Sequence, residues 1–456
     1  MNKTEAATLS FLCAALHGQT PADPGLEPGE WQKLLRLSER QKLLPLILDA
    51  AWSLPSCRAA LSRHSRPSPE QNSKISGKPA PSSAEAHGVR PSEASASPAG
   101  HSERSEAEPK NPSSQPPDWR ALVFDQVGCQ AIQENEFLNL VLALQARGLE
   151  PVSVKGPALR ALWPRPLLRP SLDDDILVSD DTVMEFHKAF LELGLRPDEP
   201  DLDPRQGQEL CYRKPGSPLF IEMHRRLFDP DSQVFAAFNE PFADALSRTV
   251  PIRIQDVTVQ TLAPTDHLLF LILHAFKHFL YSGIGLRVGA DICLFARHYA
   301  DELDMESVKA RCAALRCEGF AAALFRVGEK QLGIPAPAAF AALRADETAL
   351  LADMLEAGLY GEDIDRLHSA NITLSAAARG GLRKTEGMRS ALFPPASHLS
   401  GRYPWLKRRP WLLPAAWAAR GTDYLLHRKR YGRQSPVASL RIGRERVRLL
   451  EEYGIL

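Results

Sequence analysis

The chain has 456 residues, of which 44% are hydrophobic and 24% charged, with equal numbers of basic and acidic side chains. This length allows two or three domains, and the composition is that of a globular protein. A formal net charge of zero excludes a whole-protein electrostatic field directed at nucleic acid. The seven cysteines form no CxxC pair, so we expect reduced thiols and a cytoplasmic protein. The sequence also predicts no transmembrane segment.

The residue pattern divides the chain into five predicted segments. Residues 1–61 have helical periodicity, whereas residues 62–117 are rich in Ser, Pro and charge and contain no aromatic residue. Such a composition cannot bury enough apolar surface, so we expect a disordered insertion there. Residues 118–260 mix helix and strand patterns, residues 261–380 are mainly helical, and residues 381–456 are basic and aromatic.

Three strands are predicted after a long helix that begins at Trp119. They correspond to "EPVSVKG" at 150–156, "DDDILV" at 173–178 and "LFIEMHRRLF" at 219–228, with an amphipathic helix between the second and the third. Helices and strands mixed in this order predict an α+β fold, in which a small mixed sheet is flanked by N-terminal helices and a C-terminal helical region.

Three consecutive acids stand at the start of the second predicted strand. Because side chains alternate along a strand, Asp173 and Asp175 share one face and Asp174 faces the other way. Two such carboxylates can bind one hard cation, and pairing with the third strand would add Glu222. Repulsion between Asp173 and Asp175 predicts that neutralising either one leaves the stability of the metal-free chain equal or slightly raised. The alternative is that the three acids form a solvated turn without a metal.

The order of several short motifs resembles the nucleotidyltransferase superfamily that includes DNA polymerase β and kanamycin nucleotidyltransferase. It is most similar to a family of largely uncharacterised bacterial nucleotidyltransferases. The matching positions are a Lys-Gly turn, an R-x-x-x-D-x-D segment, an E-x-H strand and a P-x-D helix with a later H-x-x-K-H. They are, in chain order, Lys155, Gly156, Arg169, Asp173, Asp175, Val178, Glu222, His224, Pro264, Asp266, His274, Lys277 and His278.

The resemblance implies that residues 118–260 form the catalytic domain and use Mg²⁺, with two ions on Asp173, Asp175 and Glu222. It implies transfer of a nucleoside monophosphate from an NTP to a hydroxyl group, with release of pyrophosphate. Glu222 would be a metal ligand or the base for that hydroxyl. The acceptor is left open among a sugar, another small molecule, a protein hydroxyl and a nucleic-acid end.

The same resemblance implies that the Lys155–Gly156 turn lies near the phosphates, with Arg169 in a phosphate-binding or a structural role. Asp174 stands where an apolar residue is usual in this family. This departure keeps a second interpretation open, in which the chain retains the fold as a catalytically inactive binding or scaffold protein.

Histidines recur at helical spacing in the P-x-D helix. His267, His274 and His278 fall on one face, but no third zinc ligand is evident at a suitable spacing. We therefore interpret His274 and His278, together with His224, as candidate substrate contacts. On the next predicted helix, Arg287 and Asp291 are four residues apart and predict an ordinary helix ion pair.

The C-terminal region mixes basic residues with Trp and Tyr. This composition suits peripheral contact with an anionic membrane surface or nucleic acid. The alternative, which we favour, is a helix that covers the core with Trp405, Trp411 and Trp417 while its cations face water.

Overall fold

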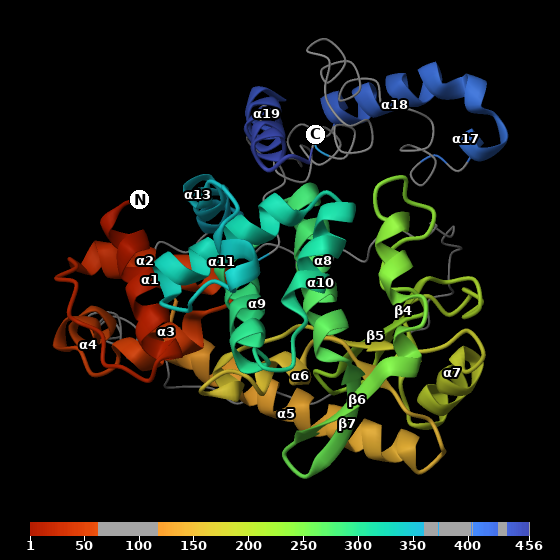
Figure 1. Ribbon diagram of the computed structural model, residues 1–456, viewed down its shortest axis with the longest axis horizontal. Helices are drawn as coiled ribbons and strands as arrows, with labels where there is room; N and C mark the ends of the chain where they lie inside the picture. Colours follow the sequence, from red (N-terminus) through yellow and green to blue (C-terminus); the bar gives the residue numbers. More distant parts are fainter. Residues whose placement is uncertain (63–116, 360–372, 374–402, 404, 427–435, 456) are drawn as a thin grey trace, which may run out of the picture.

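The computed structural model describes residues 1–62, 117–359, 373, 403, 405–426 and 436–455 (Figure 1). The predicted insertion at 62–117 therefore lies almost entirely outside the described residues. The five predicted segment boundaries remain predictions. Among the helices of the described ranges, none is both long and apolar enough to cross a membrane.

Strands within the described residues form one seven-stranded mixed sheet in the order β3-β4-β5-β2-β1-β7-β6. The three predicted strands, β1, β2 and β5, are adjacent at its centre. Pairing is parallel between β2 and β5 and between β1 and β7, and antiparallel elsewhere. The predicted α+β fold is therefore confirmed. The strand bounds are β1 Val152–Ser153, β2 Asp174–Leu177, β3 Arg196–Pro197, β4 Glu209–Arg213, β5 Phe220–His224, β6 Thr249–Ile254 and β7 Val257–Leu262.

The two faces of the sheet carry different side chains because residues alternate along each strand. On one face, Ile176, Ile221 and Met223 are buried in an apolar cluster with α5 (Trp119–Gln145) and α7 (Val183–Glu192). The opposite face carries the acids Asp175 and Glu222, and α8 (Pro264–Tyr281) lies over it. Figure 1 shows α5 running beneath the sheet, on the side away from α8 and α9.

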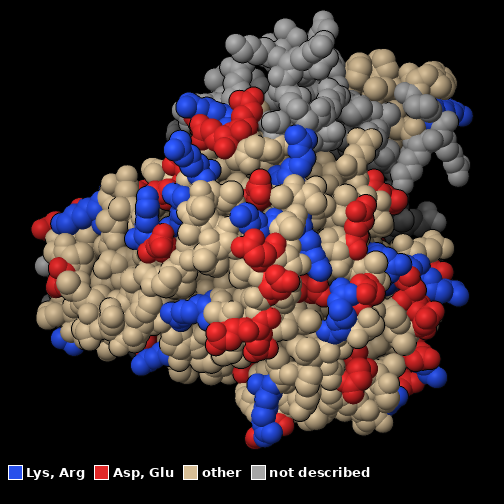
Figure 2. Space-filling model, viewed as in Figure 1, with Lys and Arg blue, Asp and Glu red and all other residues tan. Residues whose placement is uncertain are grey.

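Helices from both ends of the sequence pack into one large apolar cluster with α8. The cluster forms because the apolar faces of these helices pack against one another and against side chains of the sheet such as Leu177 and Leu262. The N-terminal helices are α1 Lys3–Leu16, α2 Pro28–Arg40, α3 Leu44–Ala51 and α4 Pro55–Ser62. Those that follow α8 are α9 Leu286–His298, α10 Met305–Ala314, α11 Glu318–Leu332, α12 Ala338–Ala341 and α13 Glu347–Ala357. On the face shown in Figure 2, basic and acidic side chains are interspersed.

The C-terminal helices are α17 (Trp405–Arg408), α18 (Leu413–Leu426) and α19 (Pro436–Glu452). Trp411 is 72% exposed and Trp405 is 37% exposed, so these side chains do not cover the core as we expected. Trp417 packs in a small separate cluster with Leu406 and Ala416. The three tryptophans are too few and too far apart in the sequence to form one apolar stripe that faces the core.

His267 joins α8 to the strand that precedes the Lys-Gly turn. Its side chain is buried, with Nε2 2.8 Å from the carbonyl oxygen of Val154 and Nδ1 3.1 Å from the hydroxyl of Thr261. A carbonyl can only accept, so Nε2 carries the proton of the neutral ring. Burial lowers the pKa of His267 from its ordinary 6.5 to about 4, against the opposing effect of the Val154 hydrogen bond. His267 is therefore a structural histidine.

We predict that His267 makes the stability of the fold depend on pH. Its folded-state pKa lies below the unfolded value, so the unfolded chain takes up the extra proton. This contribution, on the order of 3 kcal/mol, is complete above pH 6.5 and is lost as the pH falls towards 4. We would measure the free energy of unfolding by urea denaturation at several pH values between 4 and 8. This free energy should change less with pH in His267→Gln than in wild type. His298→Gln, which changes an exposed histidine, is the control. The same pH dependence of the unfolding free energy in all three proteins would contradict the role of His267.

Candidate active site

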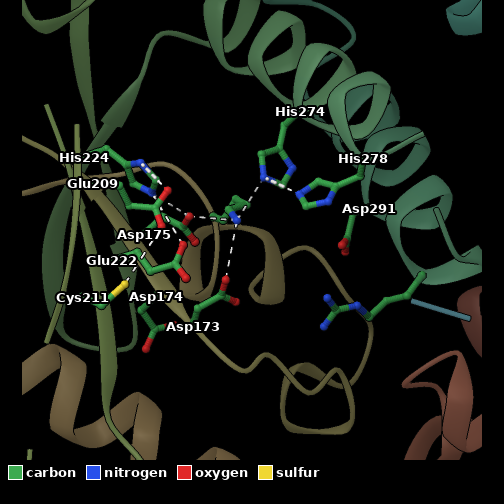
Figure 3. Close-up of polar contacts among 12 residues, drawn as sticks. Asp173, Asp174, Asp175, Glu209, Cys211, Glu222, His224, His274, His278 and Asp291 are labelled. Carbon is green, nitrogen blue, oxygen red and sulfur yellow. Dashed lines mark hydrogen bonds and ion pairs between the residues drawn. The ribbon is translucent and has the colours of Figure 1, made fainter. Parts of the chain in front are cut away.

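Strand pairing brings the predicted acids together. Asp175 of β2 is the register partner of Glu222 of β5, and donor atoms of Asp175, Glu222 and His224 lie within 4.8 Å of one another. Asp173 stands just before β2 and is close enough for its charge to act on Glu222. Burial, together with the charge of Asp173, raises the pKa of Glu222 to about 7. The geometry therefore brings Asp175 and Glu222 together with His224, and Asp173 lies beside them through its contact with Lys155 (Figure 3).

Lys155 supplies the counter-charge for these acids. Its Nζ lies 2.8 Å from Oδ1 of Asp175 and 3.7 Å from Oδ2 of Asp173. Nε2 of His224 lies 3.1 Å from the same oxygen of Asp175. Burial opposes the ionised carboxyl, but Lys155 and His224 hold the pKa of Asp175 well below its usual range. These two cations offset the repulsion that we expect among the acids, and the effect of neutralising Asp173 or Asp175 on stability stays a prediction.

His224 is a direct neighbour of the carboxylates as well as a candidate substrate contact. Burial disfavours its protonated form, yet hydrogen bonds to Asp175 and Glu222 raise its pKa to about 10. The ring is thus a cation in the metal-free chain. It neutralises part of the acidic cluster that β2 and β5 create.

The side chain of Asp174 lies on the face of β2 opposite to Asp175, where it is fully buried between the sheet and α5. Its Oδ2 accepts a hydrogen bond of 3.0 Å from Gln133, and its Oδ1 lies 3.8 Å from Nη2 of Arg160. Arg160 also donates to Glu134 at 2.5 Å and to Ser171 at 2.6 Å. Burial raises the pKa of Asp174 to about 7, although Arg160 and Gln133 act against the rise. The unusual acid therefore belongs to a buried polar network.

Gly156 allows this network to lie directly against the Lys-Gly turn. Its φ is +58°, a conformation that side chains disfavour, and a Cβ there would lie 2.4 Å from Oδ1 of Asp174. The glycine is thus required by the approach of Asp174. The expected position of this turn near the phosphates stays a prediction.

Arg169 is held away from the carboxylates by α9. It is 3% exposed and donates two hydrogen bonds to Asp291, from Nε at 2.8 Å and from Nη2 at 2.7 Å. Asp291 also accepts from the indole of Trp163 at 2.8 Å, and Arg287 donates to the carbonyl of Pro170. Both members of the predicted helix pair thus hold the loop before β2. Of the two roles considered for Arg169, this geometry favours the structural one.

α8 presents nitrogen-bearing side chains to the acidic face. Nε2 of His274 lies 3.3 Å from Nζ of Lys155 and 3.3 Å from Nε2 of His278. Burial, aided by the charge of Lys155, lowers the pKa of His274 well below its ordinary value. Lys277 is also desolvated, and its charge interacts with those of Glu209, Glu222 and Asp175. The two predicted histidines and Lys277 therefore lie opposite the carboxylates.

Sequence reasoning missed three residues near this site. Lys277 was part of the motif but was not given a role. Glu209 and Cys211 lie on β4, and their register partners on β5 are His224 and Glu222. The alternating pattern of "ELCYR" at 209–213 was the available signal, because it places Glu209 and Cys211 on one face.

We predict that replacing Asp174 by an apolar residue destabilises the fold. Asp174→Ile would leave the buried amide of Gln133 without its acceptor and Arg160 without one of its carboxylates. The expected loss is about 2 kcal/mol in urea denaturation. If Asp174 were unpaired on a buried apolar face, the same replacement by isoleucine would instead stabilise the fold. Asp174→Asn keeps an oxygen acceptor and is the control, with an expected change below about 1 kcal/mol. A more stable Asp174→Ile variant would exclude the network interpretation.

We also predict that Arg169→Lys destabilises the fold, because lysine keeps the charge but loses the two-pronged contact with Asp291. A double-mutant cycle with Asp291→Asn should give a coupling energy of about 1–3 kcal/mol. Arg253→Lys, in an exposed pair with Asp256, should leave the melting temperature unchanged. Additive effects of Arg169→Lys and Asp291→Asn would show that the two side chains act independently.

Comparison with known families agrees with the grouping of these residues. A family model described as an uncharacterised nucleotidyltransferase matches residues 96–333, a little more than half of the chain. The matched region includes every residue of the acidic face and of α8 described above. Comparisons with curated proteins and with solved structures gave no match. The extent of the family match shows that the chain belongs to this uncharacterised nucleotidyltransferase family.

Proposed function

We propose that the chain transfers a nucleoside monophosphate group from an NTP to a hydroxyl acceptor, using Mg²⁺ held by Asp173, Asp175 and Glu222. The observation that carries this proposal is the register pairing of Asp175 with Glu222, beside Asp173. Sparse carboxylate sites completed by water and substrate phosphates are typical of Mg²⁺.

The carboxylates fit a bound cation. Oδ2 of Asp175 is buried and has no hydrogen-bond partner in the part of the chain that the structure describes, which leaves an acceptor position for a cation. Glu222 and Asp173 are partly exposed, at 20% and 24% of their side chains, which leaves a route from solvent. Bound Mg²⁺ would neutralise phosphate charge and lower the pKa of the attacking hydroxyl.

Lysines on the other side of the site suit the phosphates of the NTP. Lys155 lies two residues after the end of β1, and Lys277 of α8 interacts electrostatically with the acids. In the proposed reaction the acceptor oxygen forms a bond to the α-phosphorus. The bond from that phosphorus to the oxygen bridging the β-phosphate breaks, and pyrophosphate leaves. The hydroxyl proton passes to solvent, and the lysine cations stabilise the departing negative charge.

The alternative is a protein that binds nucleotide without turnover. The fully buried Asp174 does not favour it, because this acid satisfies a structural network away from the carboxylates. Measuring nucleotide binding and pyrophosphate release side by side separates the two functions. Metal-dependent nucleotide binding without product formation would identify a binding protein.

We predict that Asp173→Asn and Asp175→Asn each lower pyrophosphate release by more than about a hundredfold, because each removes a carboxylate from the metal. The measurement uses ATP, GTP, CTP and UTP in turn with Mg²⁺, with water or a polyol as surrogate acceptor. Asp256→Asn, at an exposed position, is the matched control. Binding of each Mg²⁺–NTP pair is followed separately by thermal shift.

Two results would count against the proposed function. Pyrophosphate release at wild-type rates from Asp175→Asn would remove the carboxylates from catalysis. A thermal shift with Mg²⁺–NTP in wild type, without pyrophosphate from any of the four nucleotides, would favour the binding protein.

A further inference from the structure

A second group of atoms that could bind a metal shares Glu222 with the proposed Mg²⁺ ligands. Glu209 and Cys211 of β4 face Glu222 of β5, and ligand atoms of these three side chains lie within 4.8 Å of one another. Strand register sets this arrangement, because Cys211 pairs with Glu222 and Glu209 pairs with His224. The proposed transfer reaction uses neither Glu209 nor Cys211.

His224 gives an independent indication of a ligand at this place. Its side chain is 9% exposed, and its Nδ1 is buried without a hydrogen-bond partner among the described residues. This atom is directed towards Glu209, with 3.7 Å between Nδ1 and Oε2 (Figure 3). The other ring nitrogen, Nε2, contacts the carboxylate of Asp175 at 3.1 Å. Histidines that bind metals commonly donate their second N–H to a carboxylate in this way.

The two separations measured from Glu209 are close to those around a four-coordinate ion. Zinc bonds of about 2.0–2.3 Å place neighbouring ligand atoms of a tetrahedral site about 3.3–3.8 Å apart. Here Nδ1 of His224 is 3.7 Å from Glu209, and Sγ of Cys211 is 4.0 Å from Oε1 of the same glutamate. These separations exceed good hydrogen bonds, so a shared ion would satisfy the atoms better than they satisfy one another.

We propose that Glu209, Cys211, Glu222 and Nδ1 of His224 form a binding site for a transition-metal ion such as Zn²⁺. Sulfur and imidazole ligands distinguish this site from the all-carboxylate set proposed for Mg²⁺, because hard Mg²⁺ prefers oxygen. Binding displaces the protons of Sγ and Nδ1 to solvent and leaves the Nε2–H bond to Asp175 in place. The partly exposed side chains of Glu209 and Glu222 leave the site open to solvent.

Cobalt(II) is the probe for this site, because it replaces Zn²⁺ and its absorption reports thiolate ligation. The full-length protein is stripped of metal, kept reduced and titrated with Co²⁺ without nucleotide. We expect one equivalent of Co²⁺ to give a thiolate-to-cobalt charge-transfer band that an equivalent of Zn²⁺ abolishes. Cys211→Ser should lose the band, and Cys129→Ser, which changes an exposed cysteine on α5, should keep it.

Two further variants separate this site from the Mg²⁺ ligands and protect against a misfolded Cys211→Ser. Glu209→Gln should weaken Co²⁺ binding by at least about tenfold, because it removes a charged ligand. Asp173→Asn should weaken Co²⁺ binding much less than Glu209→Gln does, because Asp173 is not a ligand of this ion. A melting curve of each variant verifies folding.

No thiolate band in wild type, or a band that persists in Cys211→Ser, would overturn the proposal. So would a loss of Co²⁺ binding in Asp173→Asn with Glu209→Gln unaffected, which would assign the ion to the carboxylates before β2. None of these readouts requires nucleotide turnover, so this test and that of the proposed function can fail separately.

Discussion

The ammonium of Lys155 lies 2.8 Å from the buried carboxylate of Asp175, and the geometry of the acidic face depends on this contact. Carboxylates gathered on one face of a sheet repel, and burying them without a cation would cost several kcal/mol. Lys155 provides that cation from the end of β1, and His224 adds a second positive charge from β5. The fold can therefore assemble its acidic residues before any metal or nucleotide arrives.

The negative charge of each of the three consecutive acids is stabilised in a different way. Asp175 faces Lys155 and His224, whereas Asp174 faces Gln133 and Arg160 on the other side of the strand. Asp173 precedes the strand and remains partly exposed. Alternation along β2 thus separates charges that are adjacent in sequence. This separation makes a run of acids compatible with a central strand.

Features of the site that depend on neighbouring residues could be predicted from the sequence, whereas most of those that depend on residues far apart in the chain could not. The facing of the three acids could be predicted, because alternation needs only neighbouring residues. The pairing of Asp175 with Glu222 also followed once two strands were recognised as neighbours. The role of Arg169 could not be deduced, because its partner Asp291 lies 122 residues away. Glu209 was missed for a related reason, since β4 has a weak strand pattern and its importance depends on its pairing with β5.

Side-chain contacts hold the segment 169–175 where backbone pairing is sparse. β1 has two residues and β2 has four, so few ladder hydrogen bonds fix their position. Arg169 instead connects this segment to α9, Asp174 connects it to α5, and Asp175 connects it through Lys155 to His274 on α8. Helices on both faces of the sheet therefore set the position of the acids. The buried charged contacts thus provide the rigidity that longer strands would otherwise supply.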